Sequence, residues 1–159
     1  MKSALNIFLF CLITLSAFAL QTDKQAFYKT LSSGDEAVID KELAALEKAK
    51  ATSRVNAYKG ALTMKKAGFE KGVKSKVKIF KEGGALLEEE IKSNPANAEY
   101  RFLRLTVQEN APRILKYNRQ LDEDKQVIIS GFSKLDGDLK TVITNYAKDS
   151  KVLKAADLK

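Results

Sequence analysis

The alternation of hydrophobic and polar positions is helical through most of the chain and is clearest between Val77 and Pro112. In the first half of this stretch, apolar residues and one glycine recur at every third or fourth position, which places them on one face of a helix. They are Val77, Phe80, Gly84, Leu87 and Ile91. Asn94-Pro95 ends this helix, because the residue before a proline is pushed out of the α region. We expect the rest of the chain to pack against this helix and the one that follows it.

Two adjacent glycines, Gly83 and Gly84, fall inside the first of these helices. Each costs about 1 kcal/mol relative to alanine in a helix interior. We interpret them as the place where a second backbone crosses closely, at Gly84. A kink or a break in the helix is the alternative.

The second helix is expected to begin after Asn97, a favourable N-cap, and to end at Asn110-Ala111-Pro112, with the proline opening a further helix. Its apolar residues cover more than one face, which predicts a central helix with neighbours on two sides. They are Tyr100, Phe102, Leu103, Leu105 and Val107. The remaining polar face carries Arg101, Arg104 and Gln108, which we call the arginine stripe.

Similar patterns predict short helices on both sides of this pair. A first helix is expected over 22–31. A second opens at a Ser33–Glu36 capping box, with Val38, Ile39, Leu43, Leu46 and Ala49 inward, and a third is capped by Thr52 or Ser53. After the central pair, helices are expected over 114–117, from Leu121 to Gly131, and after a cap at Asp136 or Asp138. From Lys148 the chain is expected to fray, unless Val152, Leu153 and Leu158 dock. Strand signals are poor, so the sequence predicts an all-α single domain of about six to seven short antiparallel helices stacked as helix hairpins.

Residues 1–19 have the features of a secretory signal peptide: a positive Lys2, a mostly apolar run, and a small-x-small cleavage site at Ala17-Phe18-Ala19. An uncleaved anchor is the alternative, although the run is short for a membrane span. Cys11 lies inside it without the small residues that lipid attachment requires. We therefore expect an exported protein, periplasmic or secreted, with one helical domain over 20–159.

The composition excludes several kinds of chemistry. The chain has no histidine, and its one cysteine lies in the predicted signal. Thiol catalysis, serine–histidine triads and histidine-ligated metal sites are therefore excluded. We expect no catalytic residues, no cofactor and no metal. The carboxylates of Glu88–Glu90 and Asp122–Asp124 could in principle form acid/base pairs, but solvated helix faces are the preferred interpretation.

The formal net charge is +8, and residues 59–81 carry eight lysines against one carboxylate, Glu70. We call residues 59–81 the basic segment and expect residues 67–75, which contain two glycines, to form a loop. The candidate contacts are Lys71, Lys74, Lys76 and Lys78. They would suit anionic lipid or lipopolysaccharide. Nucleic acid is not expected as a partner, because the protein is expected to be exported and the segment's centre offers one aromatic residue. A solvated connector is the alternative.

The arginine stripe has two interpretations. The forked donors of arginine suit recognition of a carboxylate or phosphate in a groove, or ion pairs inside the protein. The expected internal partners are Glu99, Glu109 and the run Glu88–Glu90.

Two resemblances add to this picture. The turn Asn94-Pro95-Ala96-Asn97-Ala98-Glu99, with Tyr58 and Gly60 upstream, resembles one unit of a tetratricopeptide array, although no 34-residue period is present and Arg104-Leu105 departs from the pattern. The runs GALTMKK, EYRFLRLTVQENAP and DEDKQVI are similar to those of a family of uncharacterised exported bacterial proteins. The first resemblance implies helix-hairpin stacking, and the second implies export and a helical domain.

Our leading functional hypothesis is a non-enzymatic binding or interaction module of the bacterial envelope, bound to an unknown protein or envelope component. The alternatives are an anionic-surface binder acting through the basic segment and, third, a carboxylate-dependent hydrolase.

Overall fold

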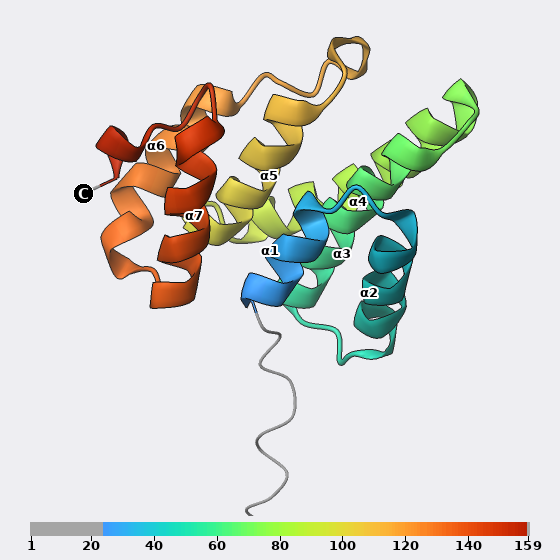
Figure 1. Ribbon diagram of the computed structural model, residues 1–159, viewed down its shortest axis with the longest axis horizontal. Helices are drawn as coiled ribbons and strands as arrows, with labels where there is room; N and C mark the ends of the chain where they lie inside the picture. The colour runs from blue at the N-terminus through green and yellow to red at the C-terminus, as the bar shows by residue number, and fades with distance from the viewer. Residues whose placement is uncertain (1–23, 159) are drawn as a thin grey trace, which may run out of the picture.

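The computed structural model describes residues 24–158, and all regular structure in that range is helical (Figure 1). The predicted signal peptide and its Cys11 lie outside the described residues. The α-helices are α1 (Lys24–Ser32), α2 (Glu36–Lys48), α3 (Ser53–Lys66), α4 (Val73–Ser93), α5 (Ala98–Asn110), α6 (Leu121–Gly131) and α7 (Gly137–Asp149). Short 3₁₀ turns occupy η1 (Ala67–Phe69), η2 (Arg113–Leu115), η3 (Phe132–Lys134) and η4 (Ala155–Asp157). The predicted all-α class is confirmed.

Helices α3 and α4 form an antiparallel pair that crosses where Gly60 faces Gly83. A methyl group on Gly83 would lie 2.6 Å from the carbonyl oxygen of Gly60, and one on Gly60 would lie 2.8 Å from that of Gly83. Gly84 has more room, since its nearest neighbour is the flexible end of Met64 at 3.5 Å. The predicted close crossing is confirmed, but it lies at Gly83 rather than Gly84.

The predicted loop over 67–75 is wrong, because only residues 70–72 separate η1 from α4. Helix α4 begins at Val73, four residues before the expected Val77. Val73, Val77 and Phe80 continue one helical spacing, and lysine itself is a good helix former. Lys74, Lys76 and Lys78 of the basic segment therefore belong to the first turns of a helix and not to a loop.

Helix α5 is central, as predicted. Asn97 caps it by accepting hydrogen bonds from the backbone nitrogens of Glu99 (3.0 Å) and Tyr100 (3.2 Å). Most of its residues are buried, on all sides of the helix. Helix α6 packs along it, and α3 and α4 also contact it.

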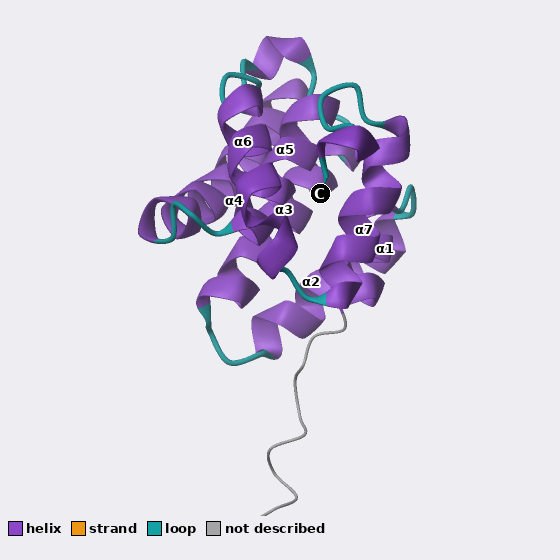
Figure 2. Ribbon diagram, turned by 90° about the vertical axis from the view of Figure 1, so that its left-hand side faces the viewer, coloured by secondary structure: helices purple, strands orange, loops and turns teal. Residues whose placement is uncertain are grey.

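The first and last α-helices of the described chain lie side by side, which brings the two ends of the fold together (Figures 1 and 2). Lys24 of α1 forms an ion pair with Asp136, the residue that caps α7. Gln25 donates a hydrogen bond of 2.7 Å to Asp138. One hydrophobic core runs through this closed arrangement.

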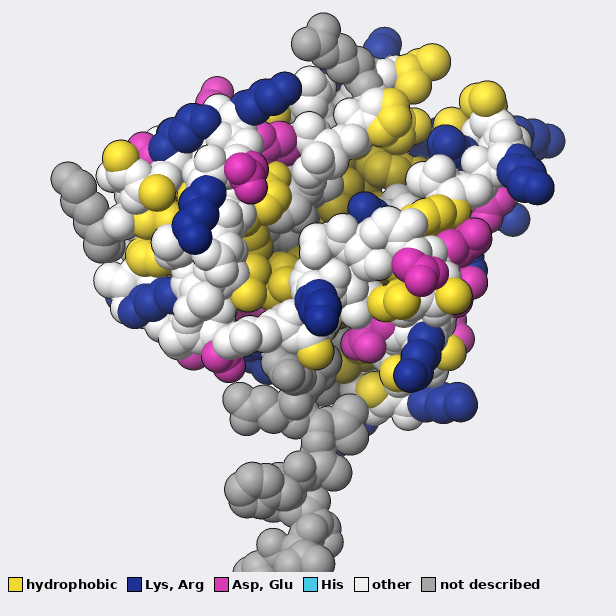
Figure 3. Space-filling model, viewed as in Figure 1, with side chains coloured by type: hydrophobic (Ala, Val, Ile, Leu, Met, Phe, Trp, Pro, Cys, Tyr) yellow, Lys and Arg dark blue, Asp and Glu magenta, His cyan; other side chains and the backbone are white. Residues whose placement is uncertain are grey.

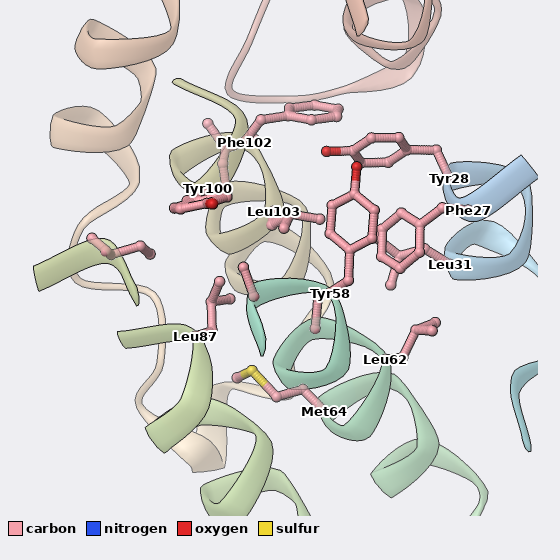
Figure 4. Packing of buried hydrophobic residues seen from close by; sticks show 14 of the residues in the cluster. Phe27, Tyr28, Leu31, Tyr58, Leu62, Met64, Leu87, Tyr100, Phe102 and Leu103 are labelled. Carbon is pink, nitrogen blue, oxygen red and sulfur yellow. The ribbon is translucent and has the colours of Figure 1, made fainter. Parts of the chain in front are cut away.

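An aromatic cluster joins α1, α3 and α5 in that core (Figure 4). The rings of Phe27 and Tyr58 stack with centroids 3.6 Å apart, and Tyr28 meets Tyr58 edge-on at 6.2 Å. Phe102 of α5 lies 5.5 Å from the ring of Tyr28. Aromatic contacts of this kind add to the stability gained from burial alone.

Three local predictions need correction. Asp35, not Ser33, caps α2, because its side chain accepts from the nitrogen of Ala37. Val38 is exposed rather than inward, since α2 packs through a narrower face. The helix expected over 114–117 is only the 3₁₀ turn η2, because Lys116 adopts a positive φ of 51° that an α-helix cannot continue.

The C-terminal end docks instead of fraying. Leu153 is fully buried, and Ser150 receives hydrogen bonds from the backbone nitrogens of Val152 and Leu153. Lys125 of α6 pairs with Asp157 at 2.8 Å. Of the two predicted alternatives, fraying from Lys148 or docking, the structure shows docking of Leu153.

Candidate functional site

The arginine stripe surrounds one fully buried carboxylate, Asp124, in the first turn of α6. Arg104 donates to both of its oxygens, from Nε to Oδ2 (2.8 Å) and from Nη2 to Oδ1 (2.6 Å). Arg101 donates to Oδ1 (3.1 Å) and Gln108 to Oδ2 (2.6 Å). Asp124 is 0% exposed. A carboxylate at this depth is tolerated because both of its oxygens accept charge-assisted hydrogen bonds.

A second carboxylate, Glu88 of α4, extends this network. It accepts from Nη1 of Arg104 at 2.7 Å and from the hydroxyl of Tyr117 at 2.6 Å. Burial disfavours the charged form of Arg104, but the hydrogen bonds and charges of Asp124 and Glu88 outweigh it and raise the pKa of its guanidinium. Burial, followed by the hydrogen bond and charge of Glu88, raises the pKa of Tyr117. The network therefore ties α4, α5 and α6 together.

This geometry is that of an internal ion-pair network. Arg101, Arg104 and Gln108 are 6%, 4% and 2% exposed. Of the partners expected from the sequence, Glu88 is present. The main partner is Asp124, which is buried and not the solvated first-turn charge that the sequence predicts. A ligand carboxylate or phosphate would have to displace Asp124 to reach these donors.

Glu99 and Glu109, the two other expected partners of the arginine stripe, form their contacts with other residues. Glu99 lies near Lys24 (3.4 Å) and Arg54 (3.8 Å) and accepts a hydrogen bond from Tyr58. Glu109 accepts from the hydroxyls of Tyr146 and Ser150, both at 2.7 Å, and thereby anchors the C-terminal segment.

The four candidate lysines of the basic segment do not share one environment. Lys71, Lys74 and Lys78 are exposed, at the end of α4 that projects from the molecule (Figures 1 and 3). Val73 among them is 76% exposed. Lys76 is half-buried and faces a cavity instead.

That cavity, which we call the central cavity, has a volume of about 1200 Å³. Its walls come from α1, the end of α3 with η1, the start of α4, the C-terminal half of α5 with the η2 turn, and α7. Figure 3 shows hydrophobic side chains lining a hollow between the η2 turn and the projecting end of α4. The apolar wall residues include Leu31, Phe69, Phe80, Phe102, Val107, Leu115 and Val142.

Two tyrosines also line the central cavity. Tyr28 is 7% exposed, and among the described side chains its hydroxyl is a buried polar atom without a hydrogen-bond partner. Burial, and after it the charge of Glu99, raises the pKa of Tyr28. Burial and then Glu109 raise the pKa of Tyr146. Both phenols are therefore uncharged at neutral pH.

Sequence patterns could not reveal the central cavity, because the apolar residues of its wall have the same helical spacing as ordinary core residues. The carboxylates of Glu88–Glu90 and Asp122–Asp124 lie away from it: Glu88 and Asp124 belong to the buried network, and Glu90 accepts from Ser53 (2.6 Å) and Asn56 (2.8 Å). Within residues 24–158, no group of three or more acidic, cysteine or histidine side chains is placed to hold a metal ion.

Comparison with protein-family models, curated proteins and solved structures finds no significant match to this chain. Among the described helices, none combines the length and the apolar composition that crossing a bilayer requires.

Proposed function

We propose that this protein is a non-enzymatic binding module that holds an apolar ligand in the central cavity. The observation that carries the proposal is the cavity itself: about 1200 Å³, walled mainly by aromatic and aliphatic side chains. Ligand pockets typically enclose about 300–1,000 Å³ with a mostly apolar lining and a few polar groups. A mostly apolar, half-open space of this size exceeds the small voids that packing defects leave in protein interiors.

The surrounding fold supports this use. The Lys24–Asp136 ion pair joins the two helices that wall one side of the cavity, α1 and α7. The Asp124 network fixes α5, which walls another side, against α6. Binding sites carried on rigid helices keep their shape without a ligand, which lowers the entropy lost on binding.

The proposal includes the setting expected from the sequence. The domain would follow an export signal and act in the bacterial envelope, as a member of the family of exported helical proteins that it resembles. We also propose that its helices stack as tetratricopeptide-like hairpins. The antiparallel α3–α4 pair and the Asn97 cap after Asn94-Pro95 support this.

The direct test uses N-phenyl-1-naphthylamine, an uncharged probe whose fluorescence rises in apolar surroundings. We expect saturable binding of about one probe per protein, and loss of binding in Val142→Trp, which places a larger side chain in the cavity wall. Val38→Trp is the matched control, because Val38 is exposed on α2 away from the cavity. Equal binding by both variants and the parent would refute the proposal.

A second candidate function is attachment to an anionic surface through the projecting end of α4. The observation that favours it is the grouping of exposed Lys71, Lys74 and Lys78 around exposed Val73. Each lysine near an anionic membrane contributes about 1 kcal/mol. Three or four of them give a dissociation constant of about millimolar or weaker. Such contacts would assist the binding module rather than act alone.

A further inference from the structure

We infer that the ligand of the central cavity is an anionic amphiphile: a single acyl or alkyl chain ending in a carboxylate or phosphate. This inference rests on the proposed function and specifies the ligand class. The chain would lie among the apolar walls, and the head would meet Lys29, Lys65 and Lys76.

The charges around the central cavity are all of one sign. Its described lining includes Lys29 of α1, Lys65 of α3 and Lys76 of α4, and no aspartate or glutamate. The whole chain has 20 acidic residues, so their absence from a lining drawn from five parts of the fold is a local feature. The tyrosines of the wall add no negative charge at neutral pH, because burial raises the pKa of Tyr28 and Tyr146.

Among the described residues, Lys29, Lys65 and Lys76 also differ from several other lysines in lacking a carboxylate partner. Lys24, Lys66 and Lys125 each lie within ion-pair distance of a carboxylate. Within residues 24–158, no carboxylate forms an ion pair with Lys29, Lys65 or Lys76. Their ammonium groups are therefore available to an anion from outside the protein.

The apolar part of the lining is suited to a hydrocarbon. Phe102, Tyr146 and Val142 form a wall that joins α5 to α7, and Leu31 extends it along α1. Such a surface stabilises a bound chain in proportion to the apolar area removed from water. A polar anion without a chain would leave this apolar surface in contact with water, and an uncharged hydrocarbon would make no ionic contact with the three ammonium groups. An amphiphile satisfies both parts at once.

The test compares ligands that share one chain and differ in the head: dodecanoate and dodecyl phosphate, each below its critical micelle concentration, and dodecan-1-ol, below its solubility limit. Each competes with N-phenyl-1-naphthylamine for the protein. We expect dodecanoate or dodecyl phosphate to displace the probe at a concentration at least tenfold lower than dodecan-1-ol. The more effective of the two anions identifies the carboxylate or phosphate source.

Charge reversal locates the head. The triple variant Lys29→Glu, Lys65→Glu and Lys76→Glu should weaken binding of the anionic ligands at least tenfold. Its affinities for the probe and for dodecan-1-ol should stay within twofold of those of the parent. The matched control reverses Lys71, Lys74 and Lys78, which changes the net charge equally but lies outside the cavity lining. It should leave all four affinities unchanged within twofold.

The results separate the inference from the proposed function. If the probe binds in the cavity but dodecan-1-ol competes as well as the anions, or the two triple variants lose anion binding equally, the inference is wrong and the binding module stands. If the probe binds and no single-chain amphiphile displaces it, the occupant is not an amphiphile, and an apolar segment of a protein becomes the candidate. If the probe does not bind, the proposed function fails as well.

Discussion

Arg104 of α5 donates hydrogen bonds from two of its nitrogens to the fully buried Asp124 of α6, at 2.8 Å and 2.6 Å. Arg101 and Gln108 complete the hydrogen bonding of the same carboxylate. Arg101, Arg104 and Gln108 thus hold α5 against α6, and Arg104 also binds Glu88 of α4. The interaction surface that remains available lies elsewhere, in the central cavity and at the end of α4.

Replacing Arg104 by alanine should lower the free energy of unfolding by about 3–5 kcal/mol, because Asp124 would remain buried without its main partner. Urea denaturation followed by far-ultraviolet circular dichroism measures this. Lys92→Ala is the control, since Lys92 is exposed on α4 and its loss should change stability by no more than about 0.5 kcal/mol. Equal, small effects of both substitutions would show that the Asp124 network does not hold the fold.

At the helix crossing, replacing each of two neighbouring glycines by alanine should change the free energy of unfolding in opposite directions. Gly83→Ala should destabilise by about 1–3 kcal/mol, because its methyl group would meet the Gly60 carbonyl oxygen at 2.6 Å and force α3 and α4 apart. Gly84→Ala should stabilise by up to about 1 kcal/mol, because alanine favours the helix and the flexible end of Met64 can give way. Thermal unfolding of the two variants measures the difference. A loss of stability at Gly84 equal to that at Gly83 would contradict the assigned crossing.

Stability should fall in acid partly through Glu109. Burial alone would raise the pKa of Glu109, but hydrogen bonds from Ser150 and Tyr146 and from the backbone nitrogens of Lys151 and Val152 outweigh it and lower the pKa. The unfolded chain therefore binds this proton more readily than the folded one. The contribution is complete above the ordinary glutamate pKa of about 4.3 and is lost as pH falls through the lower folded value.

Glu109→Gln tests this pH dependence. The variant should be less stable than the parent at pH 7, and the difference should shrink as pH falls below about 4. Urea unfolding at a series of pH values gives the two curves. Parallel curves would mean that Glu109 has no such role.

The exposed lysines predict weak, salt-sensitive attachment to anionic vesicles. At low salt the protein should sediment with vesicles that contain anionic lipid, and reversal of Lys71, Lys74 and Lys78 to glutamate should abolish this, because attraction becomes repulsion. The control reverses Lys41, Lys92 and Lys151, three exposed lysines outside the basic segment. If the two variants sediment alike, the projecting end of α4 is only a solvated helix end.

The sequence predicted much of the fold because local signals and tertiary contacts agree there. Asn97 caps α5, Asn94-Pro95 ends α4, and Asp136 caps α7, each through chemistry that acts within a few residues. Spacing alone cannot tell which of two adjacent glycines faces the neighbouring helix, so the predicted crossing differs from the observed one by one residue. Glycines among lysines predict a loop, whereas in the structure α4 already begins at Val73.

The candidate sites were harder to predict, because they depend on distant residues. Asp124 looks like an ordinary first-turn acid until α6 packs against α5 and buries it against Arg104. Lys29 and Lys76 are separated by 47 positions in the sequence yet line one cavity. Only the fold brings such groups together.

The most direct test of the binding module is methyl nuclear magnetic resonance of the protein titrated with N-phenyl-1-naphthylamine. The account predicts shifts at methyl groups of the cavity wall, including Leu31, Val107 and Val142, with little change at Ile128 and Leu153, which are buried but do not line the cavity. Shifts confined to the projecting end of α4, or no shifts at saturating probe, would contradict it.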